Sequence, residues 1–244
     1  MSGHNKWSSI KHKKAAVDSK RGKIFTRLGK LITISAREGG GDLESNFTLR
    51  MSVEKAKKAN MPKENIDKAI KRGTGEIEGG QIENIVYEAF GPGGVAFIIE
   101  TLTDNRNRTV AEIKHILSKH NGNLGSQGSV MWMFEHKGVI RISKENLKDK
   151  EEDIELVAIE SGAQDILSEA EGLTIYTSIE NFNKVKQALE KFNLNFDSDD
   201  FEYLAKDFIK ADGKDKEQLE IIAELLEDHD DVNTFFSNQS YLVF

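Results

Sequence analysis

Cysteine is absent from the 244 residues, and proline occurs only twice. The lack of cysteine excludes disulfides, cysteine-ligated zinc and thiol nucleophiles, and it suits a reducing compartment. Every apolar run is shorter than the about 20 residues that cross a bilayer. The basic N-terminal segment has no apolar core, so we expect no signal peptide. These absences predict a cytoplasmic protein without a membrane anchor.

Motifs for catalysis and small-molecule binding are also missing. Gly91-Pro-Gly-Gly94 is glycine-rich like a phosphate loop, but no lysine follows it, which favours a turn. His115 and His120 are five residues apart, a spacing that places them on different sides of a helix. The acidic run at 224–231 lacks the alternating ligands of a calcium loop, which favours a solvated acidic face. We therefore expect no enzyme activity, cofactor, metal or small-molecule substrate.

The chain does have an uneven distribution of charge. Its formal net charge is −7, yet residues 1–75 carry 18 basic and 7 acidic side chains. The remaining residues carry 16 basic and 34 acidic ones, so the two parts have balances of +11 and −18. A split of this size indicates different partners at the two ends. A polyanion is the partner expected at the basic end.

Basic side chains are densest in the first 37 residues, where ten are basic and one is acidic. Lysine and arginine neutralise phosphates and release counterions, and an aromatic side chain among them can stack on an exposed base. Two alternatives stay open: the arm is merely solvated, or Trp7 fastens it to the helical core. The candidate nucleic-acid-binding residues here are His4, Lys6, Trp7, Lys11, His12, Lys13, Lys14, Lys20, Arg21, Lys23 and Arg27.

A second basic site is predicted in the loop at 104–108. Arg106 and Arg108 bring two guanidinium groups to the entry of a helix, where anions are favoured. An equally good interpretation is that these side chains cap and brace the loop.

Residues 1–73 follow helical periodicity. The spacing of apolar residues predicts a helix over 23–37 that ends at Gly39-Gly40-Gly41, and a second over 49–60. Pro62 suits the first position of a third helix, and Gly73 suits its end. The basic end of the chain is therefore predicted to be all-helical.

After a glycine-rich linker at 73–80 the pattern changes to strands. Two β-rich runs, 85–90 and 95–102, form a predicted hairpin. Thr109 and Glu112 have the spacing of a capping box at the start of a helix, and 130–134 is predicted to be an apolar strand. This fragment lacks a second helix and a further strand to complete a domain.

Residues 138–204 follow the order strand, helix, strand, strand, helix, strand, which is the ferredoxin-like pattern. A helix near 219–226 and a strand near 232–236 can complete the preceding fragment. We therefore predict an α+β protein with three domains, the third inserted in the second. These are a basic helical domain at 1–75, an α+β (ferredoxin-like) domain made of 76–136 plus 205–244, and an inserted ferredoxin-like domain at 137–204.

Several motifs resemble those of one family. They are the segments 1–14, 21–25, 39–42, 59–62, 73–75, 91–95 and 102–109, in this order along the chain. Together they resemble the YebC/PmpR family, which includes the mitochondrial translational activator of cytochrome c oxidase subunit I. The resemblance covers the whole chain and is densest over 1–135; Asn5 departs from the serine that is common there. It implies a crescent-like, three-domain, non-enzymatic protein of the cytoplasm.

Two functions are compatible with this resemblance. The customary family description is a DNA-binding transcriptional regulator, which would need a helix that reads base edges in a groove. The alternative, which we favour, is a ribosome- or rRNA-associated translation factor whose acidic domains face ribosomal proteins. The inserted domain lacks the aromatic signature of an RNA-recognition sheet and is acidic. Nucleic-acid binding is therefore expected in residues 1–75 under either function.

Overall fold

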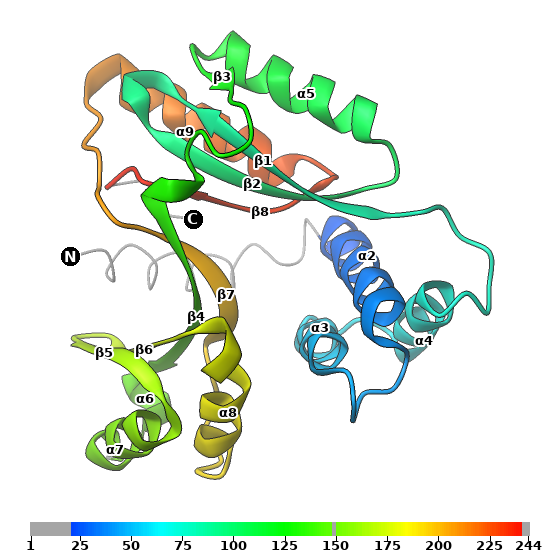
Figure 1. Ribbon diagram of the computed structural model, residues 1–244, viewed down its shortest axis with the longest axis vertical. Coiled ribbons are helices and arrows are strands. Elements are labelled where there is room, and N and C mark those ends of the chain that lie inside the picture. The colour runs from blue at the N-terminus through cyan, green and yellow to red at the C-terminus, as the bar shows by residue number, and fades with distance from the viewer. Residues whose placement is uncertain (1–20, 148–149, 241–244) are drawn as a thin grey trace. The chain divides into compact units, whose positions relative to one another are not determined.

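The computed structural model describes residues 21–147 and 150–240. The eight candidate residues from His4 to Lys20 lie outside these ranges. The described chain forms two compact units, one made of 21–130 with Asp212–Phe235 and the other made of Met131–Ala211 with 236–240 (Figure 1). The fold is α+β, as predicted, and one unit is inserted in the sequence of the other. In the described residues no helix is long and apolar enough to cross a membrane.

Three helices open the first unit: α2 (Arg21–Gly39), α3 (Phe47–Lys58) and α4 (Lys63–Gly73). Their apolar faces meet in a core that includes Ile32, Leu49 and Ile66. The Asn46 side chain accepts a hydrogen bond from the Leu49 N–H and so caps α3. Pro62 is the residue before α4 rather than its first residue. All three helices follow the periodicity of the sequence.

The same unit holds a four-stranded sheet in the order β3-β1-β2-β8 (Figure 1). Its strands are β1 (Glu83–Phe90), β2 (Ala96–Thr103), β3 (Asn123–Leu124) and β8 (Val232–Ser237). Helices α5 (Arg106–Lys119) and α9 (Gly213–Asp228) pack against each other, and His120 after α5 contacts Gln218 of α9 at 2.8 Å. The C-terminal helix and strand thus complete this sheet, as the sequence predicts.

The β1–β2 hairpin turns through Gly91 and the short 3-10 helix η1 (Pro92–Gly94). Gly93 and Gly94 have φ of +67° and +76°, a region that residues with a side chain rarely adopt. The glycine-rich segment is therefore a turn, as predicted.

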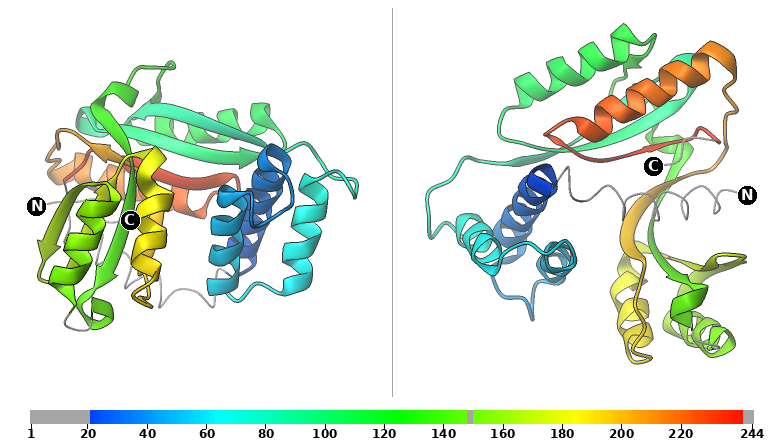
Figure 2. Two further views of the ribbon diagram at one scale, coloured as in Figure 1. Left: turned by 60° about the horizontal axis from the view of Figure 1, so that its bottom comes forward. Right: turned by 180° about the vertical axis from the view of Figure 1, so that it is seen from behind.

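The inserted unit has the ferredoxin-like strand order, β5-β6-β4-β7, with all neighbouring strands antiparallel. Its strands are β4 (Phe134–Ser143), β5 (Ala163–Glu169), β6 (Gly172–Thr177) and β7 (Ser198–Ala205), and its helices are α6 (Lys144–Leu147), α7 (Glu151–Ser161) and α8 (Ile179–Glu190). Helices α7 and α8 pack against each other (Figure 2). Two buried ion pairs, Arg141 with Glu202 and Lys186 with Asp199, tie the edge strand β7 to the rest of the unit.

Two local predictions are wrong. The apolar run 130–134 contains the 3-10 turn η2 (Met131–Met133) before β4 begins, and the Trp132 side chain is 65% exposed. The capping box is also misplaced, because α5 begins at Arg106 with Asn105 as its cap. Thr109 is buried inside the helix, where its hydroxyl has tertiary partners. A single-sequence pattern cannot distinguish a capping threonine from one that is buried by a distant residue.

Candidate nucleic-acid interface

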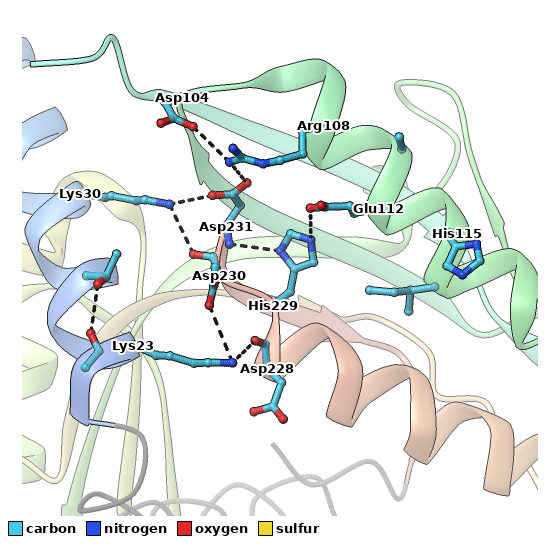
Figure 3. A pocket seen from close by; sticks show the side chains of 14 residues that line it. Lys23, Lys30, Asp104, Arg108, Glu112, His115, Asp228, His229, Asp230 and Asp231 are labelled. Carbon is cyan, nitrogen blue, oxygen red and sulfur yellow. Dashed lines mark hydrogen bonds and ion pairs between the residues drawn. The ribbon is translucent and has the colours of Figure 1, made fainter.

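Three cations of α2 form a stripe on one helical face, because Lys23, Arg27 and Lys30 are four and three residues apart. The stripe meets the segment Glu227–Asp231, which joins the end of α9 to β8 and which we call the acidic turn. Figure 3 shows Lys23 and Lys30 reaching the acidic turn from one side. Cations that the sequence suggests for phosphate binding thus contact an acidic segment of the same unit.

Lys23 and Arg27 bind mainly to backbone oxygens of the acidic turn. Lys23 Nζ donates to the Asp228 carbonyl at 2.8 Å and lies 3.7 Å from an Asp230 carboxylate oxygen. Arg27 donates to the His229 carbonyl at 2.9 Å and to the Glu227 carbonyl. These carbonyls stand at the C-terminal end of α9, where the helix dipole is negative and orphan acceptors need donors. The α2 stripe therefore caps α9.

Asp231 is the centre of this arrangement and is only 3% exposed. Its carboxylate accepts hydrogen bonds from Lys30 and Arg108 at 2.7 Å each, and from the Thr109 hydroxyl at 2.8 Å. Burial acts to raise the pKa of Asp231, but the bonds from Arg108, Lys30 and Thr109 outweigh it and hold that pKa well below its usual range. One carboxylate thus joins α2, α5 and β8.

His229, a residue of the acidic turn, contacts α5 on the side away from α2 (Figure 3). Its Nδ1 accepts from the Asp231 N–H at 3.1 Å, so the ring proton is assigned to Nε2, which lies 3.0 Å from a Glu112 carboxylate oxygen. Ligand atoms of Glu112, His229 and Asp231 come within 4.8 Å of one another. Lys30 and Arg108 already neutralise Asp231, so a metal ion here would face two cations. We interpret the group as a hydrogen-bond cluster.

At the start of α5, Arg108 braces the chain, which is the second of the two interpretations of the segment 104–108. Arg108 pairs with Asp104 at 3.1 Å as well as with Asp231, and these contacts raise the pKa of Arg108. The Asn105 side chain caps the helix by accepting from the Arg108 N–H. Arg106 is exposed at the first position of α5. Arg108 thus serves the acidic turn, and Arg106 faces solvent.

The structure brings only some of the predicted site residues together. Arg21 lies over the Phe25 ring at 5.5 Å, while Lys23, Arg27 and Arg108 converge on the acidic turn. Asp231 was missed as an individual, because the acidic run to which it belongs suggests a solvated face. That interpretation is wrong for Asp231, although Asp230 is 77% exposed. Arg37, near the end of α2, is exposed and donates to the Ile82 carbonyl. The other exposed cations of the helical region are on or beside α3 and α4: Lys57, Lys58, Lys63, Lys68, Lys71 and Arg72.

Comparison with known proteins gives a consistent result. Residues 5–76 match the model of the TACO1/YebC protein N-terminal domain, and residues 82–239 match that of the TACO1/YebC second and third domain. A relative from Halothermothrix orenii, named "probable transcriptional regulatory protein", is 49% identical over 98% of this chain and 94% of its own length. A relative of the same name from Thermotoga maritima is 48% identical over 98% and 93%.

The fold is also found in a crystal structure. A conserved hypothetical protein from Aquifex aeolicus matches with a TM-score of 0.82 and 40% sequence identity, over 92% of each chain. The likeness extends across both compact units, because it covers nearly the full length.

Proposed function

This chain belongs to the TACO1/YebC family, and from that premise we propose that it is a non-enzymatic regulator of gene expression that binds nucleic acid. Binding takes place through the basic N-terminal part, and the partner is ribosomal RNA in the cytoplasm. The acidic remainder of the chain faces basic ribosomal proteins.

The observation that carries this proposal is the charge split between residues 1–75, at +11, and the rest of the chain, at −18. Contacts to phosphates supply most of the sequence-independent affinity for nucleic acid. Lys23, Arg27 and Lys30 of α2 are already paired with the acidic turn, so the contacts fall to the arm at 1–20 and to the exposed cations on α3 and α4. The acidic parts of the molecule repel the same polyanion.

A DNA-binding transcriptional regulator is the second candidate. The name of the relatives favours it, and so does the four-residue connection 59–62 between α3 and α4, a length found in helix-turn-helix motifs. A recognition helix reads bases with its N-terminal residues. In α4 these positions include Glu64 and Asp67, whose charges oppose the approach of DNA phosphates. We therefore favour the ribosomal role.

Co-sedimentation with ribosomes at low salt tests this choice. We expect the full chain to pellet with ribosomes and the triple variant Lys11→Ala/Lys13→Ala/Lys14→Ala to remain in the supernatant. The matched control is Lys184→Ala/Lys191→Ala/Lys214→Ala, which removes three exposed lysines from the acidic part of the chain. If the chain does not pellet with ribosomes but protects one promoter sequence from cleavage, the transcriptional role is correct instead.

A further inference from the structure

A groove of about 390 Å³ lies beside α2 and α4. Its walls include Phe25, Lys30, Met61, Asn65, Lys68 and Arg72. We infer that this groove holds one unstacked nucleotide of a bound single strand. The inference rests on the proposed nucleic-acid function and names the ligand of one place on that surface.

The α4 wall of the groove is cationic. Lys68 and Arg72 are four residues apart, so their side chains extend from the same face of α4, and both are exposed. A Cβ placed on Gly79 would lie 2.8 Å from Arg72 Nε and would overlap the aliphatic stem of Arg72. The linker backbone therefore packs directly on Arg72 and restricts its position. Two cations one helical turn apart suit the phosphate of a nucleotide.

The remaining walls suit a base. The half-buried Phe25 and the Met61 side chain provide apolar surface, and an aromatic ring is the usual stacking partner of an unpaired base. The Asn65 amide offers both a donor and an acceptor for a base edge. Gly29 leaves the groove open, because a Cβ there would meet only Met61, at 3.7 Å.

Size and charge distinguish this ligand from other anions. Sites for small organic molecules occupy about 300–1,000 Å³, and this groove is at the lower end, too small for a duplex. A bare phosphate would leave the Phe25 and Met61 surface uncovered. Among the described lining residues, Lys30 is paired with Asp231 and Asp104 is paired with Arg108, so Lys68 and Arg72 give the groove its positive balance.

The test uses the full chain and a fluorescent single-stranded RNA dodecamer, with affinity measured over a range of salt. We expect Lys68→Ala/Arg72→Ala to weaken binding at least about tenfold more than the control Lys57→Ala/Lys71→Ala, which removes the same charge from exposed positions outside the groove lining. The salt slope should also fall by about 0.7 relative to the wild type, since each neutralised phosphate on a single strand contributes about 0.7 and the two cations share one phosphate.

A second variant blocks the groove without changing charge. Gly29→Leu places an aliphatic side chain in the groove, whereas Gly22→Leu places one on the same helix where a Cβ meets nothing within 4 Å. We expect the first to weaken RNA binding and the second to leave it unchanged, with both proteins melting at or above the wild-type temperature.

The outcomes separate the two levels of the proposal. If the wild type binds no RNA, the proposed function fails together with the groove. If it binds RNA but the groove variants behave like their controls, the groove assignment alone is overturned. Competition by AMP and GMP distinguishes the source of the ligand: displacement of RNA by micromolar mononucleotide would mean that the groove takes a free nucleotide and not one within a strand.

Discussion

Asp231 is a buried carboxylate that accepts hydrogen bonds from two cations and so links separate helices. It is buried, and its partners Lys30 and Arg108 are on different helices. Removal of one member of a buried charge pair leaves the other cations without a counterion. Substitution of Asp231 should therefore lower the stability of the whole fold.

We predict that Asp231→Asn lowers the free energy of unfolding by about 3–5 kcal/mol, because the amide removes the charge that Lys30 and Arg108 require. Urea unfolding followed by circular dichroism measures the change. Asp230→Asn is the control, since that neighbour is 77% exposed, and it should stay within about 0.5 kcal/mol of the wild type. Equal losses of unfolding free energy in the two variants would show that Asp231 stabilises the fold no more than its exposed neighbour does.

The stability that Asp231 provides should depend on pH. The pKa of Asp231 in the folded protein is below its unfolded value of about 3.9. The stabilisation is therefore fully present above about pH 5 and is lost as the pH falls through and below about 4. Denaturation midpoints measured from pH 7 to pH 3 should fall less steeply in Asp231→Asn than in the wild type. Parallel curves would contradict the assignment.

At the scale of elements, α2 and α4 approach each other closely at Gly73. A Cβ at this residue, the last of α4, would lie 2.6 Å from the Ala36 Cβ of α2 and would overlap the Thr33 carbonyl oxygen. Neither neighbour is the flexible end of a side chain, so the helices themselves would have to separate. The predicted stop signal at Gly73 is thus also a packing requirement.

We predict that Gly73→Ala lowers the free energy of unfolding by about 1–3 kcal/mol, as overpacked contacts do. Gly22→Ala is the matched substitution, because its Cβ meets nothing within 4 Å, and it should raise stability by about 0.5–1 kcal/mol through helix propensity. Thermal unfolding of the two variants provides the comparison. A stabilising effect at both glycines would show that α2 and α4 are not in close contact.

At the scale of the whole molecule, a net charge of −7 opposes association with any polyanion unless the basic end meets it first. Affinity should therefore depend steeply on salt. We predict that Lys11→Ala/Lys13→Ala/Lys14→Ala flattens the slope of log K against log salt by about 2 for single-stranded RNA, and equally for every sequence. Fluorescence anisotropy at several salt concentrations measures it. A loss confined to one sequence would mean that these lysines contact bases.

Much of the fold is determined by local patterns in the sequence. The strands of the inserted unit and its helices α7 and α8 follow in the predicted order. Alternation and helical periodicity arise from which side chains each element must bury, and this information lies within a few residues. The strand predicted at 130–134 was wrong for the same reason. A short apolar run has the same local pattern in a buried strand as in a turn that exposes Trp132.

The charge asymmetry was also evident from the sequence, because counting needs no structure. The sequence could not decide which cations are available to a partner. Lys30 and Asp231 are 201 residues apart, and only the packing of α2 beside α9 and β8 brings them to 2.7 Å. Lysines of one stretch look equivalent in a sequence, whereas burial and a fixed counterion differ for each of them in three dimensions. Tertiary structure therefore determined that α2 braces the acidic turn, while Lys68 and Arg72 of α4 stay exposed to solvent.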